Sequence, residues 1–418
     1  MIDDRHFDVI QVMFKQSLFV KIFFLTHLLA TVSRVLDMKV SPIGILFAIH
    51  LLVAGYFSWI ICFSVGLPLL ILSSILPFFN NVMSFVTSFV MTTFMQSIIF
   101  FVEHIYGTNI TTSGDQINNI DPKTHQPIPL ILISNNRTQI DFIFLWSLFE
   151  RSNLLTFLKI VVLSKVSSIP LIGWSCQFFQ YIFLDKASWD SDKTNIIHSI
   201  QSMSATAPTI LIFPEGTDLC DGIMKSNEYG MKNNLSVKKH VLHPRINGTQ
   251  LLLQQFMKSY PNNKFKIYDL TMLTKDYKDN QITSPESLAA GTMPWNVHID
   301  VQEIPLHSIS SILQEQEQEK KKDAFKTWLR NRFDRKEQML NQYYIDGKET
   351  FSTKQRLLSK RFFPSIRILF SIILIWIAVY YYFIKIQPFI LSILVGVQLI
   401  INLTLGGVHY MKMKIDNK

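Results

Sequence analysis

A polar segment at residues 134–141, between two apolar runs, combines residue types that could bind an anion or assist a proton transfer. Asn136 and Asp141 place an amide and a carboxyl group five positions apart, and Arg137 adds a guanidinium. The segment follows a predicted strand and opens a predicted helix, where unpaired backbone N–H groups favour a polar side chain or a bound anion. It is therefore the first candidate site in the chain.

Two further segments have the same character. Residues 211–218 run from an apolar strand directly into a Pro-Glu-Gly sequence. Glu215 then stands at the carboxyl end of a strand, and Gly216 lets another backbone or a ligand approach closely. Residues 242–245 form a proline-containing turn that presents Arg245, whose guanidinium could pair with phosphate. Each segment alone is also typical of an ordinary turn or cap, so only the combination indicates a site.

The elements that must position these segments alternate between short β-rich runs and helical runs from about residue 121 to residue 313. This alternation is typical of an α/β fold. Strands are predicted at residues 130–134, 159–163, 181–184, 209–213, 241–242, 266–271 and 297–301. Helices are predicted at residues 140–151, 171–179, 194–203 and 248–258. We expect the strand ends to converge on a membrane surface.

The region before the α/β part is predicted to contact lipid. Residues 40–102 contain no Asp, Glu, Lys or Arg, and the apolar run 43–79 is long enough to cross a bilayer. Pro68 stands in the middle of that run, so either one tilted span or a kinked pair of half-helices fits it. Residues 80–101 mix Asn, Ser and Thr with Met and Phe, which favours an interfacial helix, with a buried core helix as the alternative.

The carboxyl-terminal region has two apolar runs, at residues 368–384 and 388–405, which predict a transmembrane helical hairpin. Basic residues flank the hairpin on both sides, so both flanks are expected on the cytosolic side. Residues 314–344 predict an amphipathic helix with a solvated face rather than a binding role. The amino-terminal segment carries acids in place of a basic region, which argues against a cleaved signal peptide.

These patterns divide the chain into four parts: membrane and interfacial helices at 1–110, the α/β domain at 111–313, an amphipathic helix and basic linker at 314–361, and the hairpin and basic tail at 362–418. Hydrophobic residues make up 48% of the 418 residues and charged residues only 17%, which favours a lipid partner. The net charge of +9 suits an anionic partner. The basic residues do not form an aromatic-basic RNA motif, so nucleic acid is not expected as a partner.

Cofactor chemistry has little support in the sequence. The three cysteines, Cys62, Cys176 and Cys220, are too few and too scattered for a disulfide framework or a zinc cluster. No phosphate-binding loop or glycine-rich dinucleotide motif is present in the sequence. We therefore predict no metal and no cofactor.

In order and spacing, the candidate segments resemble the glycerolipid acyltransferase family, the 1-acylglycerol-3-phosphate acyltransferase-like proteins, whose motifs include NHxxxxD and FPEG. The resemblance is closer to the lysocardiolipin and lysophosphatidylinositol acyltransferase branch. It rests on NNRTQIDFIFLW from Asn135, IPLIGW from Ile169, YIFLDK ending at Lys186, FPEGTD from Phe213 and VLHPR ending at Arg245. The family fold is an acyltransferase-type mixed sheet flanked by helices, and the carboxyl-terminal hairpin also fits the branch.

The resemblance implies transfer of a fatty acyl group from acyl-coenzyme A, as a substrate, to a free hydroxyl of a lysophospholipid. In the family motif a histidine is the general base on that hydroxyl, and an aspartate orients the imidazole. Asp141 matches the aspartate, but Asn136 occupies the histidine position. An amide cannot take a proton near neutral pH, and loss of a general base costs roughly 100- to 10,000-fold in rate.

The resemblance also implies a set of substrate-binding residues. The set is Asn135, Arg137, Lys186, Phe213, Pro214, Glu215, Gly216, Thr217 and Arg245. Glu215 and Gly216 would shape the acceptor site, and Arg137 and Arg245 are the leading contacts for phosphate or coenzyme A. Lys186 and Asp218 stand where relatives have Arg. The change at Asp218 argues for a headgroup larger than that of lysophosphatidic acid.

Two functions follow from these residues. The first is a membrane-bound acyl-CoA:lysophospholipid acyltransferase in the endoplasmic reticulum, with the α/β domain in the cytosol and the mitochondria-associated membrane as an alternative address. The second is a catalytically impaired relative that binds acyl-CoA, lysophospholipid or a partner enzyme without turnover, because Asn136 replaces the base. A rearranged site that uses His243 as the base is a minority hypothesis.

Overall fold

The computed structural model describes most of the chain between residues 41 and 360. It describes residues 41–360 apart from 67, 70–71, 73–75, 77, 169–171, 204–205, 262–263, 275–287, 289 and 346–354, together with residues 396–397, 400 and 402. The predicted span at 368–384 lies outside the described residues, as does nearly all of the second hairpin run. The transmembrane hairpin therefore stays a prediction.

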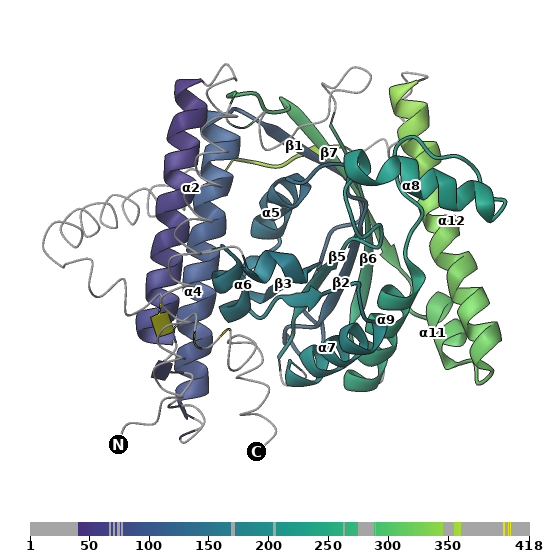
Figure 1. Cartoon of the computed structure of the whole chain (residues 1–418), viewed down its shortest axis with the longest axis horizontal. Coiled ribbons are helices and arrows are strands. Elements are labelled where there is room, and N and C mark those ends of the chain that lie inside the picture. The colour runs from purple at the N-terminus through teal and green to yellow at the C-terminus, as the bar shows by residue number, and fades with distance from the viewer. Residues whose placement is uncertain are drawn as a thin grey trace, which may run out of the picture.

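The centre of the molecule is a mixed eight-stranded sheet with the strand order β4-β3-β5-β2-β6-β7-β1-β8 (Figure 1). The first five strands in this order run parallel to their neighbours, whereas β6 and β7 are antiparallel. The strands are β1 (Asn109–Gly114), β2 (Leu130–Ser134), β3 (Leu158–Leu163), β4 (Ile182–Leu184), β5 (Thr209–Ile212), β6 (Lys266–Thr274), β7 (Asn296–Ile304) and β8 (Arg356–Leu357). The predicted mixed α/β sheet is therefore present.

Both faces of the central strands are buried, which explains their continuous apolar sequences. In β2, Leu130 and Leu132 join one hydrophobic cluster, whereas Ile131 and Ile133 join another on the opposite face. Successive side chains of a strand point to opposite faces, so a strand covered on both sides must be apolar at every position. Strands β2 and β5 follow this pattern along their apolar runs, whereas β3 contains Lys159 and is only partly buried.

The helices form two layers, one on each side of the sheet (Figure 1). One side carries α4 and α5, with α2 and α6 packed against or beside them, and the other carries α7, α9 and α12. The helices are α2 (Pro42–Ile61), α4 (Phe78–Phe100), α5 (Asp141–Arg151), α6 (Ile172–Phe178), α7 (Trp189–Ser202), α8 (Leu219–Lys232), α9 (Ile246–Ser259), α11 (His307–Gln314) and α12 (Gln318–Tyr344).

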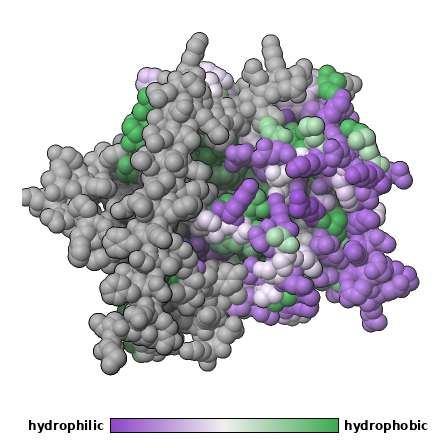
Figure 2. Space-filling model, viewed as in Figure 1, coloured by the Kyte–Doolittle hydropathy of each residue, from purple (hydrophilic) through white to green (hydrophobic). Residues whose placement is uncertain are grey.

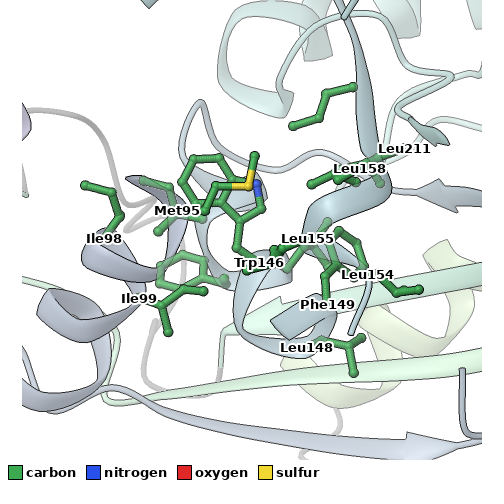
Figure 3. Close-up of a cluster of buried hydrophobic side chains, with 14 of the residues drawn as sticks. Met95, Ile98, Ile99, Trp146, Leu148, Phe149, Leu154, Leu155, Leu158 and Leu211 are labelled. Carbon is green, nitrogen blue, oxygen red and sulfur yellow. The ribbon is translucent and has the colours of Figure 1, made fainter. Parts of the chain in front are cut away.

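Helix α4 lies partly in the protein core, which favours the buried-helix alternative for one of its faces. Met95, Ile98 and Ile99 pack in the same hydrophobic cluster as Trp146 of α5 (Figure 3). The opposite face exposes Phe78, Phe85 and Phe89, with exposed fractions of 71%, 70% and 58%. The stretch Phe78–Ile105 is long and apolar enough to cross a membrane, so the described residues contain one such helix.

Several features of the fold differ from the sequence prediction, and helix α11 and strand β8 are among the elements that were not predicted. Residues 241–242 form no strand, because side chains rather than a neighbouring strand accept their backbone N–H groups: Glu337 accepts from Val241 at 3.0 Å and Glu215 from Leu242 at 2.7 Å. Strand β1 was not predicted because its sequence is mostly polar. It pairs with β7 in parallel and includes residues on both sides of the predicted domain boundary at residue 110. Helix α8 was also not predicted, although Asp218 caps its first turn by accepting from the Asp221 N–H group.

Helix α12 has a different environment from the predicted solvated helix. Phe325, Leu329, Phe333 and Leu340 are completely buried in the cluster that also contains Ile131 of β2. The outer surface on this side of the molecule, over α8 and α12, is mostly hydrophilic (Figure 2), with scattered exposed apolar side chains such as Met224 and Met231 of α8. The helix is therefore amphipathic as predicted, but its apolar face forms part of the core of the α/β unit.

Candidate active site

The first two candidate segments meet because β2 and β5 are adjacent and parallel. Ile133 pairs with Ile212, so the loops that follow the two strands leave the same edge of the sheet side by side. The Asn136 N–H group donates a hydrogen bond to Glu215 Oε2 across the two loops. This contact brings the polar segment at 134–141 and the Pro-Glu-Gly turn into one site.

Glu215 also contacts the third segment, at residues 242–245. Its Oε1 accepts a hydrogen bond of 2.7 Å from the Leu242 N–H group, and the Arg245 N–H group donates to Pro214 O at 2.8 Å. Glu215 is buried, with an exposed fraction of 2%, and both carboxyl oxygens are occupied by backbone groups of other loops. The structure therefore gives Glu215 the role of joining the three segments.

Burial raises the pKa of Glu215 to about 8, although the N–H donors of Leu242 and Asn136 and the ammonium group of Lys336 act in the opposite direction. Unfolding would return the carboxyl group to its ordinary value of 4.5. The folded protein then keeps a proton that the unfolded chain releases between these two pH values. This contribution to stability is fully present below pH 4.5 and is lost as the pH rises towards 8.

We expect a Glu215→Gln variant to lack this pH dependence. The glutamine side chain is neutral at every pH, whereas the wild type loses stability as the pH rises from 5 to 8. Thermal unfolding of both full-length proteins in the same detergent at pH 5, 6.5 and 8 measures the effect. The wild-type midpoint should fall relative to the variant across this range, and a constant difference would mean that Glu215 stays ionised in the folded protein.

Asp141 is fixed by the loop that precedes it. Its carboxylate accepts hydrogen bonds from the N–H groups of Arg137, at 2.5 Å, and Thr138, at 3.0 Å, and from the Thr138 hydroxyl. Burial raises its pKa to about 6, against the effect of these donors. Asp141 stands where the family aspartate would orient an imidazole, and in this chain the Thr138 hydroxyl donates to its Oδ1 while the two backbone N–H groups donate to its Oδ2. Asn136 is half-buried at the edge of the same loop.

Asn135 differs from the expectation that it binds substrate. The residue is completely buried, its amide N–H donates to Met272 O at 3.1 Å, and its carbonyl oxygen accepts from the Met272 N–H group at 2.8 Å. A side-chain amide that pairs with both backbone groups of one residue extends the hydrogen bonding between β2 and β6. The structure therefore assigns Asn135 to holding the loop on the sheet.

Two of the predicted cationic residues gather at the Gly216 turn. Lys186 Nζ donates to Gly216 O, and a Cβ atom added to Gly216 would lie 3.0 Å from Arg245 Cδ. Gly216 has a φ of +73°, so both its backbone conformation and the close approach of Arg245 require glycine. Burial and the charge of Arg245 lower the pKa of Lys186 to about 8. A bound anion would offset this repulsion between neighbouring cations.

The rest of the Pro-Glu-Gly segment builds the turn. Phe213 is half-buried against the hydrophobic cluster and its carbonyl accepts from the Gly216 N–H group at 3.0 Å. Thr217 packs its methyl group against Gly222 of α8. Asp218, which the sequence linked to headgroup size, is buried and caps α8. Phe213, Thr217 and Asp218 therefore shape the site through the fold.

The structure gives no support to His243 as a replacement base. Its ring faces α8, where a Cβ atom added to Gly230 would lie 2.5 Å from Nε2 and where Tyr229 is 6.3 Å away between ring centroids. Burial and the nearby ammonium group of Lys238 lower its pKa. In the described part of the chain, the hydrogen bonds to Asp141 come from residues 137 and 138 and not from His243.

Comparison with known proteins identifies the segment that carries these contacts. Residues 116–246 match the family model described as Acyltransferase. This segment is an acyltransferase-family domain. It contains every predicted site residue, and the expected resemblance to the glycerolipid acyltransferase family is confirmed.

The similarity to curated relatives extends beyond the matched segment. Lysocardiolipin acyltransferase 1 from Gallus gallus is 28% identical over 323 residues, which cover 76% of this chain and 78% of the relative. Lysophosphatidylinositol acyltransferase 10 from Caenorhabditis elegans is 31% identical over 255 residues, which cover 59% of each chain. Among solved structures, the 1-acyl-sn-glycerophosphate acyltransferase from Thermotoga maritima is 12% identical, with a TM-score of 0.36 over 70% of this chain and 97% of that chain.

Residues of α12, outside the matched segment, also contact its loops and were not among the predicted site residues. Glu337 of α12 accepts hydrogen bonds from the backbone N–H groups of residues 239–241, and Tyr344 lies against Arg137. Lys336 is 1% exposed, pairs with Asp269 at 2.6 Å and donates to Leu270 O. Its position within the apolar stripe of α12, between Phe333 and Leu340, was the available signal.

Within the part of the chain that the structure describes, no group of three or more His, Cys, Asp or Glu side chains is placed to hold a metal ion. Cys62 is buried, Cys176 is half-buried and Cys220 is exposed, and these three thiols are free. The polar groups of the candidate site are two buried carboxyl groups, the Asn136 amide and the cationic side chains of Arg137, Lys186 and Arg245. This set is suited to holding an anionic substrate.

Proposed function

We propose that this chain transfers a fatty acyl group from acyl-CoA to the free hydroxyl of a lysophospholipid at a membrane surface. The observation that carries the proposal is the convergence of the three family segments on Glu215, which joins the loops at Asn136, Pro214 and Leu242. The names of the curated relatives, lysocardiolipin and lysophosphatidylinositol acyltransferases, support an acidic lysophospholipid as the acceptor class.

In the proposed reaction the acceptor hydroxyl attacks the thioester carbonyl carbon. A new C–O ester bond forms, the C–S bond breaks, and the sulfur leaves with its electron pair. The hydroxyl proton ends on that sulfur, so coenzyme A leaves as a thiol. The Asn136 amide oxygen can accept a hydrogen bond from the hydroxyl but cannot take its proton. We therefore expect a slow enzyme in which the residues contribute orientation and charge rather than base catalysis.

The cationic residues are proposed to hold the phosphate groups of the substrates. Lys186 and Arg245 lie together at the Gly216 turn, and Arg137 stands on the neighbouring loop. Arginine binds phosphate through two parallel hydrogen bonds, whereas lysine acts as a point charge. No metal and no cofactor is required for this proposal, since acyl-CoA is consumed as a substrate.

The proposed membrane contact is the exposed apolar face of α2 and α4. Ile45, Leu46 and Ile49 of α2 and Phe85 and Phe89 of α4 are exposed large apolar residues. Such a surface is costly in water and stable in a bilayer. With the hairpin, this face would anchor the protein to the endoplasmic reticulum, or to the mitochondria-associated membrane, with the α/β domain in the cytosol.

The test is acyl transfer from labelled oleoyl-CoA to a panel of lysophospholipids by the purified full-length protein in detergent or vesicles. We expect measurable transfer by the wild type, with monolysocardiolipin or lysophosphatidylinositol preferred over lysophosphatidic acid. Asp141→Ala should abolish it, because three hydrogen-bond donors of the loop lose their acceptor. Equal activity of Asp141→Ala and the wild type would contradict the proposed site.

A second candidate function is binding without turnover. The observation that favours it is the amide at position 136, in the place of the family base. Such a protein would hold acyl-CoA, a lysophospholipid or a partner enzyme in the same pocket. Saturable binding of oleoyl-CoA by a wild type that transfers no acyl group to any member of the panel would support it.

A further inference from the structure

Arg137 is held at both ends within the site. Its backbone N–H group donates to Asp141 at 2.5 Å, and its guanidinium carbon lies 4.4 Å from the centroid of the Tyr344 ring. Its Nη1 atom is buried and has no hydrogen-bond partner among the described residues. A guanidinium over an aromatic face is attracted to the ring while its in-plane N–H groups stay available for an anion.

The Tyr344 ring is itself fixed in place. Its hydroxyl donates to Thr274 O at 2.9 Å and accepts from the Thr274 N–H group at 3.1 Å, at the end of β6. His240 stacks on the ring with the centroids 5.2 Å apart, and Tyr343 meets it edge-on at the same distance. A ring held from three sides offers the guanidinium one defined position.

Helix α12, which ends at Tyr344, is itself held against the body of the protein. Three backbone N–H groups of residues 239–241 donate to Glu337, and Lys336 forms a buried ion pair with Asp269. Lys336 also donates to Leu270 O of β6. These contacts fix the last turns of α12 against the same loops that Glu215 joins, so Tyr344 belongs to the site although it lies about 100 residues beyond the matched domain.

We propose that Tyr344 is a positioning residue for substrate phosphate, because its ring holds the Arg137 guanidinium beside Asn136 and Asp141. This inference rests on the proposed function, since it assumes that Arg137 binds a substrate phosphate. That phosphate belongs either to the lysophospholipid headgroup or to coenzyme A. A preorganised guanidinium binds more tightly because less side-chain entropy is lost when the anion arrives.

The test compares Tyr344→Leu, which removes the ring, with Tyr344→Phe, which keeps the ring and removes the hydroxyl. We expect Tyr344→Leu to raise the KM of one substrate about three- to tenfold with little change in kcat, and Tyr344→Phe to stay near the wild type. Separate titrations of oleoyl-CoA and of the lysophospholipid, each with the other saturating, identify which substrate carries the phosphate. Inhibition by inorganic phosphate measures binding of the phosphate group alone, without the rest of either substrate.

Two controls separate positioning from a general structural role. In an Arg137→Gln background, Tyr344→Leu should have no further effect on KM, because the guanidinium that it positions is gone. Trp328→Leu removes a matched pair on the same helix, Arg332 over the Trp328 ring at 5.3 Å, and should leave both KM values unchanged. Equal effects of Tyr344→Leu in both backgrounds, or an unchanged KM, would overturn the inference.

Direct binding distinguishes failure of this inference from failure of the proposed function. Equilibrium binding of coenzyme A and of the lysophospholipid to the full-length proteins is measured in the absence of turnover. If the wild type binds neither, the proposed function fails. If the wild type binds and Tyr344→Leu binds equally well, only the role of Tyr344 is wrong. Thermal unfolding of each variant checks that it is folded.

Discussion

Replacing Asn136 with histidine is expected to raise acyl transfer by about 100- to 10,000-fold, which is the usual contribution of a general base. The change places a proton acceptor where the hydroxyl of the acceptor lipid is proposed to lie, five positions before Asp141. The loop around it is already formed, since the Asn136 N–H group is held by Glu215 and residues 137 and 138 by Asp141. The gain should appear in kcat, because the binding residues are unchanged.

The matched control is Asn136→Gln, which keeps an amide and adds one methylene group. It should show no gain, because neither amide takes a proton near neutral pH. The activity of Asn136→His should also rise with pH through the pKa of the new imidazole, whereas the wild type should show no such limb. A folded Asn136→His variant that binds acyl-CoA but is no faster than the wild type would show that position 136 does not limit the reaction.

The effect of Asp141→Asn is expected to depend strongly on the residue at position 136. In the wild-type chain the asparagine oxygen can still accept the N–H bonds of Arg137 and Thr138, and its NH₂ group can donate to the Thr138 hydroxyl. The loop should therefore keep its shape, and acyl transfer should change little. In the Asn136→His background the carboxylate is needed to orient and stabilise the imidazole, so Asp141→Asn should remove most of the gain, about 100-fold or more.

Kinetics of the four proteins, the wild type, the two single variants and the double variant, measure this coupling. The predicted result is a strongly non-additive cycle, because the two residues act as a unit only when position 136 is histidine. Additive effects would mean that Asp141 supports the loop but does not orient the introduced base. Thr138, whose hydroxyl donates a hydrogen bond to Asp141 in the wild type, would then be the next residue to replace.

The main outline of the fold could be predicted from local sequence. Apolar runs such as 130–134 and 209–213 are short, lack charges and end in polar turns, so their type and position were clear. The first two site segments were predicted for the same reason, since they directly follow β2 and β5. The third, at residues 242–245, was predicted to follow a strand that the structure does not form. Whether these segments meet depends on the order of the strands in the sheet. The first two meet because β2 and β5 are adjacent and parallel.

The parts that were missed depend on contacts distant in sequence. Asn135 was assigned to substrate because it precedes the motif position, but its amide pairs with Met272, 137 residues away. Tyr344 contacts Arg137 across an even longer separation, and nothing local to either residue indicates the pair. Lys336 was the exception, because a lysine inside an apolar stripe of a helix requires a buried partner such as Asp269.

The boundary between membrane and domain was also placed by composition rather than by contacts. Strand β1 begins at Asn109 and pairs with β7, which lies near the end of the predicted α/β domain at 111–313. The sheet therefore includes residues on both sides of the predicted division at 110. Helix α12 likewise shares a hydrophobic cluster with β2 and α9. A polar strand and a charged helix can both belong to a core when the rest of the fold provides their partners.

The most direct test of the proposed site is equilibrium binding of oleoyl-CoA to the purified full-length wild type and to Asp141→Ala, in the same detergent. Binding is required whether or not Asn136 permits turnover, so the result does not depend on the rate of the reaction. We expect saturable binding by the wild type and at least tenfold weaker binding by a folded Asp141→Ala. The absence of saturable binding by the wild type, to oleoyl-CoA and to every lysophospholipid of the panel, would contradict it.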